Sequence, residues 1–266
     1  MADIQKVLTD SIQSLISNTL KDGKISDLKK KHDAKVHFIP YRYRVFSGLL
    51  QSMNIQFGNF IERAVHEILA HNTKLEIVSE YSGIKQNRFK ISYESNALID
   101  SYITSCQINN YSETELKNSY NALINKINSN EQNSNLSCID FKHDIDVLFR
   151  EKESNIHYYV EIKYNDDHDT GKYVDINRKF LKTYAYLARE LGQKIKLVPI
   201  LFYFTNKKMK GNIYVPENEV IYRGKRFFDS FTNIRYEDVD RYMKNISECE
   251  KTKKIFDDLY NKIVQQ

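Results

Sequence analysis

The chain has 266 residues, 28% of them charged and 41% hydrophobic, with a formal net charge of +5 at pH 7. The 8 glycines and 3 prolines exclude collagen-like and Pro/Gly-rich disordered classes. Three cysteines without a Cys-x-x-Cys pair exclude a disulfide framework and a cysteine-rich zinc site, and no apolar run approaches the roughly 20 residues of a membrane span. We therefore expect a soluble, cytoplasmic protein without a signal peptide or membrane segment.

Helical periodicity dominates the first half of the chain. Apolar residues recur at helical spacing over 4–20 and over 44–71. Gly23 is placed where a C-cap would end the first helix, and Gly58 indicates a break or a close packing contact in the second. The other elements predicted here are a polar stretch up to residue 35, a strand at 75–81, a helix at 94–107, a helix from a capping box at Ser112 and Glu115 to about 128, and a loop at 128–137.

The second half changes to strand-like patterns. A hairpin of two strands, a helix, a near-continuous apolar strand and further helices follow one another. Their predicted ranges are 143–150 and 156–165 for the hairpin, 175–191 for the helix, 196–204 for the apolar strand, 213–228 for a strand or hairpin, and 236–264 for the final helices. This order predicts an α/β fold with a central mixed sheet flanked by helices and a helix-rich N-terminal half.

We expect one domain over 1–266, because the loop at 128–137 is too short to separate two domains. Its parts would be a mainly helical portion, a sheet core and a C-terminal portion that is partly helical. The corresponding ranges are 1–130, 140–205 and 206–266.

Positive charge is concentrated between residues 171 and 226. This segment holds 13 Lys and Arg against 4 Asp and Glu, a net +9, whereas the whole chain is +5. Such a local excess is what a surface that binds a polyanion needs. A solvated surface without a partner is the alternative explanation.

Acidic side chains occur on two neighbouring apolar strands. Asp144 and Asp146 share one face of the first strand of the predicted hairpin, and Glu161 and Lys163 share one face of the second. Burying a carboxylate costs several kcal/mol unless it is paired or bound to a metal. Carboxylates that converge beside a lysine suit Mg²⁺, which prefers oxygen ligands. An exposed hairpin with a surface Glu–Lys pair is the alternative.

The order Asp146, turn, Glu161-Ile-Lys163 resembles the PD-(D/E)xK nuclease signature, with Ile145 in place of the usual proline. Two further blocks, at 39–65 and 219–233, resemble type II restriction endonucleases of the TdeIII type, and a HinfI-like family is the other assignment left open. The first block carries Pro40-Tyr41-Arg42, Ser52-Met53-Asn54, Phe57-Gly58 and Ile61-Glu62. The resemblance covers about half the chain and implies a restriction-endonuclease-like fold.

By this resemblance Asp146 and Glu161 would ligate Mg²⁺ and Lys163 would be the catalytic lysine. Glu62 would reach the same site as an additional acid or a ligand of a second metal, or it is a solvated helix residue. Asp144 is the rival of Asp146, since both point the same way on the predicted strand.

DNA contacts are expected from the basic segment. The residues predicted to bind phosphate are Arg178, Lys179 and Lys182, at the start of the helix after the catalytic strand, and those predicted to approach base edges are Asn206, Lys207, Lys208, Arg223, Lys225 and Arg226. Arg42 and Arg44 would either approach DNA or form salt bridges.

The resemblance implies a type II restriction endonuclease that cleaves both strands of double-stranded DNA with Mg²⁺. A homodimer follows from a two-fold site, and the site would be a short palindrome, interrupted as in GGNCC or GANTC. A DNA methyltransferase is expected as a genetic partner. The alternatives are a structure-specific repair or recombination nuclease of the same fold, and a DNA-binding module without catalysis.

Overall fold

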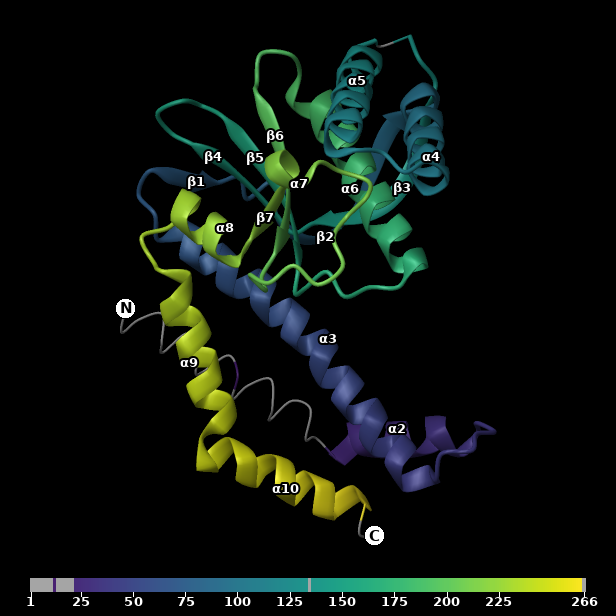
Figure 1. The fold of residues 1–266 in the computed structure, drawn as a ribbon, viewed down its shortest axis with the longest axis vertical. Coiled ribbons are helices and arrows are strands. Elements are labelled where there is room, and N and C mark those ends of the chain that lie inside the picture. The colour runs from purple at the N-terminus through teal and green to yellow at the C-terminus, as the bar shows by residue number, and fades with distance from the viewer. Residues whose placement is uncertain (1–11, 13–21, 134, 265–266) are drawn as a thin grey trace. The chain divides into compact units, whose positions relative to one another are not determined.

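The computed structural model describes residue 12 and residues 22–133 and 135–264. The chain divides into two compact units, one made of Met1–Ile68 with Asn233–Gln266 and the other of Leu69–Thr232 (Figure 1). The helix predicted over 4–20 lies, apart from residue 12, outside the described residues. One nuclease domain over 1–266 stays a prediction, because two compact units can belong to one domain or to two.

The described part of the first unit is helical. Its elements are α2 (Asp22–Asp33), α3 (Tyr41–Ala70, which continues into the second unit), α9 (Tyr236–Glu248) and α10 (Glu250–Val264). Helix α2 replaces the predicted polar stretch, and Gly23 lies inside this helix rather than at a C-cap. We find no helix among the described residues whose length and hydropathy would let it cross a bilayer.

The long helix α3 is continuous through Gly58, so the predicted break is wrong. A methyl group added at Gly58 would meet no atom of the described residues within 4 Å, so these residues make no close packing contact there. The close approach is instead at Gly48, where an added Cβ would lie 2.5 Å from Nε2 of His32 on α2. Arg44 donates to the carbonyl oxygens of His32, at 2.9 Å, and Lys35, at 2.7 Å, and so stabilises the C-terminal end of α2.

The second unit is built on a five-stranded mixed sheet, which confirms the predicted fold class. The strands, in spatial order, are β1 (Leu75–Ile77), β4 (Val147–Glu151), β5 (His157–Lys163), β6 (Leu197–Tyr203) and β7 (Ile221–Arg223). The pairs β1–β4 and β4–β5 are antiparallel, whereas β5–β6 and β6–β7 are parallel. A second, two-stranded antiparallel sheet contains β2 (Gly83–Ser92) and β3 (Cys138–Ile145).

The strand predicted over 143–150 is two strands that belong to different sheets. It is interrupted at Asp146, and β3 pairs with β2, a strand that was not predicted. The register of β4 with β5 starts at Val147 opposite Val160. Beyond it, the backbone N–H of Ile162 donates to the Asp146 side chain at 2.6 Å. A side chain therefore replaces the next backbone partner, and the chain can leave one sheet for the other.

The helices of this unit start and end close to their predicted positions with two exceptions. They are α4 (Tyr93–Ile108), α5 (Glu113–Glu131), α6 (Thr170–Leu191), α7 (Glu217–Val220) and α8 (Gly224–Phe231). The capping box of Ser112 and Glu115 is confirmed. Helix α6 begins earlier than predicted, because Asp169 caps it by accepting from the N–H of Lys172. The strand or hairpin predicted over 213–228 is wrong for most of its length, since only β7 is extended between α7 and α8.

The two faces of the sheet carry different aromatic contacts. On one face Tyr159 stacks on Phe180 of α6, with ring centroids 5.4 Å apart. On the other face Phe202 stacks on Phe227 of α8 at 4.1 Å. Helices α4 and α5 pack against α6 (Figure 1). Since residues two apart on a strand share a face, Glu161 and Lys163 lie on the same side of β5 as Tyr159, toward α6.

Candidate active site

Asp146, Glu161, Lys163 and the carbonyl group of Ile162 meet where β3 passes into β4 beside β5; we call them the strand-end cluster. The Lys163 Nζ lies 2.7 Å from Glu161 Oε1, 2.7 Å from the Ile162 carbonyl oxygen and 3.6 Å from Asp146 Oδ2. The ammonium group is therefore surrounded by three oxygen atoms from two parts of the chain. The structure brings together the three residues that the sequence predicted as the core of the site.

Glu161 is held from its other side by two groups. Its Oε2 accepts a hydrogen bond from the Tyr159 hydroxyl at 3.0 Å and lies 3.6 Å from Nε2 of His143. Glu161 is only 2% exposed. Burial acts to raise the pKa of this carboxyl, but the Lys163 ammonium and His143 outweigh it and hold the pKa of Glu161 below its usual value. Glu161 is therefore an ionised carboxylate with one oxygen anchored and the other facing Lys163.

Tyr159 can act only as a donor to this carboxylate. Burial, reinforced by the negative charges of Glu161 and Asp146, raises the pKa of Tyr159 well above its usual value. The phenol stays protonated across the physiological range, so its hydroxyl hydrogen orients Glu161. Its position two residues before Glu161 on an apolar strand was the sequence signal that could have identified it. The approach of His143 to Glu161 depends on how β3 lies beside β5, and the sequence does not predict it.

The geometry favours Asp146 over Asp144 as the aspartate of the cluster. Asp146 Oδ2 accepts from Ile162 and lies next to Lys163. Asp144 belongs to β3 in the two-stranded sheet. Neighbouring residues on a strand point to opposite faces, so the contact of His143 with Glu161 places Asp144 on the other face of β3.

The strand-end cluster fits a hard cation. No group of three or more His, Cys, Asp and Glu side chains among the described residues is arranged to hold a metal ion. Mg²⁺ does not require such a cage, because it is usually bound by one or two carboxylates with waters and substrate phosphates. The Lys163 ammonium already occupies a position among Asp146, Glu161 and the Ile162 carbonyl oxygen. These oxygen donors and this positive occupant are what a magnesium site with two carboxylates requires.

Glu62 is not placed with respect to this cluster. It lies on α3 in the first compact unit, and it is half-buried there. Its role as an additional acid stays a prediction.

The phosphate-binding residues predicted on α6 lie in the middle of the helix, not at its start, because α6 begins at Thr170. Arg178 pairs with Asp100 of α4 through Nε at 2.8 Å. Lys179 is exposed, and Lys182 is half-buried, so that burial lowers the pKa of its ammonium.

The residues predicted to read bases lie in the loop after β6, at the end of β7 and on α8. Asn206, Lys207 and Lys208 are exposed in the loop after β6, and the Asn206 side-chain oxygen accepts from the N–H of Lys225 at 3.0 Å. Lys225 also forms an ion pair with Asp229 on α8. Arg226 stacks over the Tyr222 ring, 3.9 Å from its centroid.

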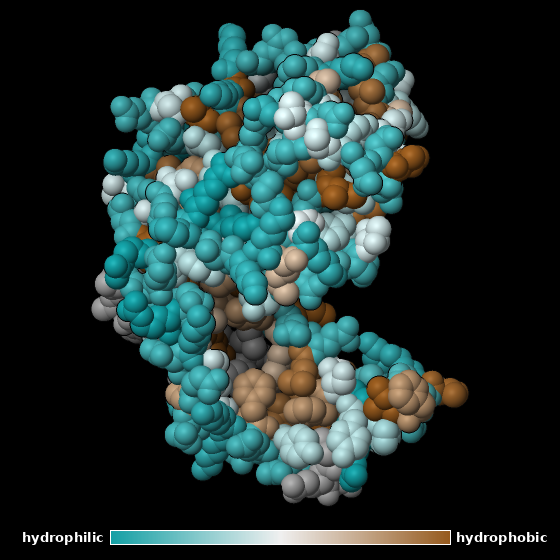
Figure 2. All heavy atoms as spheres, viewed as in Figure 1, coloured by the Kyte–Doolittle hydropathy of each residue, from teal (hydrophilic) through white to brown (hydrophobic). Residues whose placement is uncertain are grey.

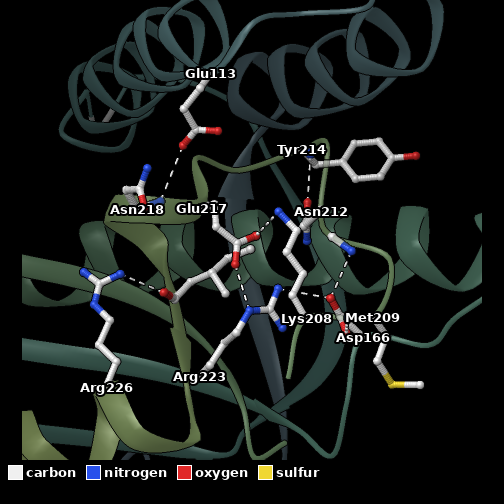
Figure 3. Close-up of polar contacts among 12 residues, drawn as sticks. Glu113, Asp166, Lys208, Met209, Asn212, Tyr214, Glu217, Asn218, Arg223 and Arg226 are labelled. Carbon is white, nitrogen blue, oxygen red and sulfur yellow. Dashed lines mark hydrogen bonds and ion pairs between the residues drawn. The ribbon is translucent and has the colours of Figure 1, made fainter. Parts of the chain in front are cut away.

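Arg223 is the most enclosed of the predicted base readers. Its side chain is 12% exposed, and its guanidinium pairs with Asp166 and Glu217 (Figure 3). Asp166 was missed in the sequence, where it belongs to the polar run Asn165-Asp166-Asp167-His168-Asp169 that has the pattern of a solvated loop.

Comparison with known proteins identifies two matches to this chain. A family model described as "Type II restriction endonuclease, HinfI" matches residues 1–247. The "Type II restriction enzyme HinfI" of Haemophilus influenzae is 50% identical over 262 residues, covering 98% of each chain. No solved structure matches. Of the two families that the sequence left open, the match is to HinfI.

Proposed function

This chain belongs to the HinfI family of type II restriction endonucleases, and from this premise we propose that the strand-end cluster hydrolyses both strands of double-stranded DNA with Mg²⁺. The chain is a site-specific deoxyribonuclease of a restriction–modification system. The observation that supports this location is the Lys163 ammonium held among three oxygen atoms at the interruption between β3 and β4. Two carboxylates that share one lysine could hold the divalent metal with which phosphodiesters are hydrolysed.

Each residue of the cluster has a proposed role. Asp146 and Glu161 would hold the metal, and Glu62 is proposed as a further acid. A bound Mg²⁺ supplies a Lewis acid and lowers the pKa of a bound water. Lys163 places its positive charge against the phosphoryl oxygens, where negative charge develops during the reaction. Tyr159 and His143 orient Glu161 through its second oxygen.

The residues proposed to contact DNA differ in whether they would have to give up an ion pair within the protein. Lys179 and Lys207 are exposed and can reach phosphates directly. Arg178 and Lys225 hold surface ion pairs, which contribute little and can be exchanged for a phosphate. Figure 2 shows hydrophilic side chains over most of the visible face of the second unit, residues 69–232. The remaining candidates are Lys182, Asn206, Lys208, Arg223 and Arg226.

We propose a second copy of this chain as the protein partner, because a two-fold DNA site is matched by a two-fold protein. The DNA site is proposed to be a short palindrome, continuous or interrupted. The enzyme would act in the cytoplasm, and a DNA methyltransferase encoded nearby would protect the host chromosome.

Cleavage of a plasmid by the purified protein tests the proposal. We expect discrete fragments with Mg²⁺ or Mn²⁺, no product in EDTA, and binding without cleavage in Ca²⁺, whose longer and looser ligand shell positions water poorly. Binding should weaken as salt rises, because contacts with phosphate release counterions. Cleavage in excess chelator would exclude a metal-dependent site, a smear would favour a structure-specific nuclease, and binding without any cleavage would favour a binding module.

A further inference from the structure

Asp166 is a fully buried carboxylate three positions after Lys163 in the chain. Its Oδ1 accepts from the backbone N–H of Met209 at 3.0 Å, and its Oδ2 accepts from the N–H of Gly211 at 3.0 Å and from Arg223 Nη2 at 3.0 Å. These bonds join the segment after β5 to the loop after β6 and to the end of β7 (Figure 3). One carboxylate thus connects three segments that follow the parallel strands of the sheet.

Arg223 extends this connection to a second acid. Its Nε donates to Glu217 Oε1 at 2.8 Å, and its guanidinium lies over the Tyr203 ring, 5.3 Å from the centroid. The other oxygen of Glu217 lies 3.3 Å from Lys208 Nζ. Hydrogen bonds between charged groups with little exposure are stronger than those at the surface. Arg223 is therefore engaged on several sides within the protein.

The loop held in this way begins beside the predicted catalytic lysine. We call residues 204–216 the lysine loop, because it contains Lys207, Lys208 and Lys210 and no acidic residue. Strands β5 and β6 are parallel and end in register, with Lys163 opposite Tyr203. Two further backbone bonds continue this pairing, from Phe204 N to Lys163 O and from Thr205 N to Tyr164 O, both 2.8 Å.

The far end of the lysine loop has its own anchors. The Asn212 side chain donates to Asn177 of α6 at 3.1 Å, and the Tyr214 carbonyl oxygen accepts from Tyr102 of α4 at 2.8 Å. Between these ends, the middle of the loop is held through its backbone by Asp166, and through its exposed side chains by contacts of Lys210 with Asp167 and the His168 carbonyl oxygen. The bonds of Asp166 are the buried ones, so we expect them to contribute most to the position of the lysines. The middle of the loop is the part that projects polar side chains, since Lys208 and Lys210 are exposed and Met209 is exposed beside them.

We propose that Asp166 and Arg223 form a latch that positions the lysine loop for sequence-selective DNA contact. This inference rests on the proposed DNA cleavage at the strand-end cluster. Asp166 is a positioning residue, and the lysine loop, not Arg223, determines specificity on this edge of the sheet. A loop that is already ordered avoids most of the entropy cost of ordering on binding, so its contacts contribute fully to discrimination.

A matched control exists in the same unit. Glu131 is also a buried carboxylate that binds a backbone N–H, that of Ser92, and one arginine, Arg189. The test therefore compares Asp166→Asn and Arg223→Gln with Glu131→Gln. An amide at position 166 would present an NH₂ donor to groups that are themselves donors, so it would release the loop.

The first readout needs no DNA. Trypsin cleaves after lysine, and the lysine loop offers three sites. We expect Asp166→Asn and Arg223→Gln to accelerate cleavage within the loop, at temperatures well below unfolding, while Glu131→Gln leaves this rate as in the wild type. Unchanged cleavage of the loop in both latch variants would overturn the latch. The trypsin experiment tests the latch even if the wild type does not cleave DNA. Absence of DNA cleavage by the wild type would reject the proposed function, not the latch.

The second readout is selectivity. The site is mapped by sequencing the ends of plasmid fragments, and kcat/KM is measured on a duplex with this site and on duplexes altered at one base pair. We expect the ratio between them to fall about tenfold in both latch variants, as for the loss of one base contact, and to stay within about twofold of the wild type in Glu131→Gln. A released loop with an unchanged ratio would overturn the specificity role. If Asp166→Asn does not fold, Asp166→Ser takes its place in both measurements, because Arg223 is itself a candidate DNA contact and its loss alone could lower selectivity.

Discussion

Two glutamates of the second unit are almost completely buried, and they differ in how their charge is balanced. Glu131, the last residue of α5, accepts from the backbone and hydroxyl of Ser92 and from Arg189 Nε at 2.7 Å. Glu161 faces Lys163 and His143, and a second carboxylate, Asp146, adjoins the same lysine. The first set of contacts joins α4, α5 and α6, whereas the second places two acids around one flexible cation.

This difference shows how a buried acid that stabilises the fold can be told from one that serves chemistry. Both pay a desolvation cost of several kcal/mol. Glu131 recovers it from donors that hold it in one geometry, and Arg189 is held in place by the same contacts. The counter-ion of Glu161 is instead a lysine, a point charge on a flexible stem that Asp146 also adjoins, so it can move when a metal or phosphate arrives. Two neighbouring carboxylates also attract a further cation, which a fully balanced pair does not.

The largest expected effect is the loss of DNA cleavage when a residue of the strand-end cluster is replaced. Asp146→Ala, Glu161→Ala and Lys163→Ala should each reduce cleavage by about 10³-fold or more, because each removes a metal ligand or the charge that stabilises the phosphoryl group. Initial rates on a linear duplex with Mg²⁺ measure this, and far-UV circular dichroism checks folding. Cleavage at the wild-type rate by Glu161→Ala would show that the site lies elsewhere.

The next effect concerns the free energy of unfolding, which should depend more on Glu131 than on Glu161. Glu131→Ala should lower the free energy of unfolding by about 3 kcal/mol, because it leaves the half-buried Arg189 and the buried N–H of Ser92 without their partner. Glu161→Gln should lower it by only about 1 kcal/mol, since the amide oxygen can still accept a hydrogen bond and Lys163 keeps Asp146 as a counter-ion. Urea unfolding of the three proteins decides this. Equal losses would contradict the distinction drawn here.

A smaller change sharpens the description of how Glu161 is held. Tyr159→Phe removes only the hydroxyl that donates to Glu161 Oε2, so the Mg²⁺ concentration for half-maximal cleavage should rise about tenfold. Isothermal titration with Mg²⁺ should show the same shift in the absence of DNA. Tyr158→Phe, one residue earlier and on the opposite face of β5, is the control and should leave both values as in the wild type. An unchanged metal requirement in Tyr159→Phe would mean that this hydrogen bond does not orient the carboxylate.

The smallest expected effect separates the two aspartates. Asp144→Ala should change the cleavage rate by less than about threefold, because Asp144 lies on the other face of β3 from the residue that reaches Glu161. The rate is measured beside that of Asp146→Ala. If Asp144→Ala abolishes cleavage and Asp146→Ala remains active, the two residues exchange roles.

Several features could be read from local patterns because local interactions produce them. The capping box at Ser112 and Glu115, the helical spacing of α4, and the apolar run of β6 each depend on residues within a few positions of one another. The pairing of Asp146 with Glu161 and Lys163 needed one further step, which was to place two consecutive strands side by side. Consecutive strands joined by a short turn pair as a hairpin in most cases.

Other features depend on hydrogen-bond partners far along the chain, which the sequence alone does not identify. The strand interruption at Asp146 arises because its side chain takes the N–H of Ile162. Helix α5 runs on to Glu131 because that residue finds Ser92 and Arg189. In each case a hydrogen bond between distant segments decides where an element ends. The spacing of apolar residues near that end cannot predict such a bond.

By itself the sequence determined the α/β class, the resemblance to type II restriction endonucleases, and the three residues proposed as the catalytic core, because periodicity, motif order and charge are properties of the chain. Only the tertiary structure decided that Tyr159 and His143 hold Glu161, and that Asp166 encloses Arg223, which sequence reasoning had assigned to base contacts. The physical reason is the low tolerance of the interior for unpaired polar groups. A charged residue that looks solvated in the sequence becomes a structural connection when folding brings it a buried partner, as happens to Asp166 in its run of polar residues.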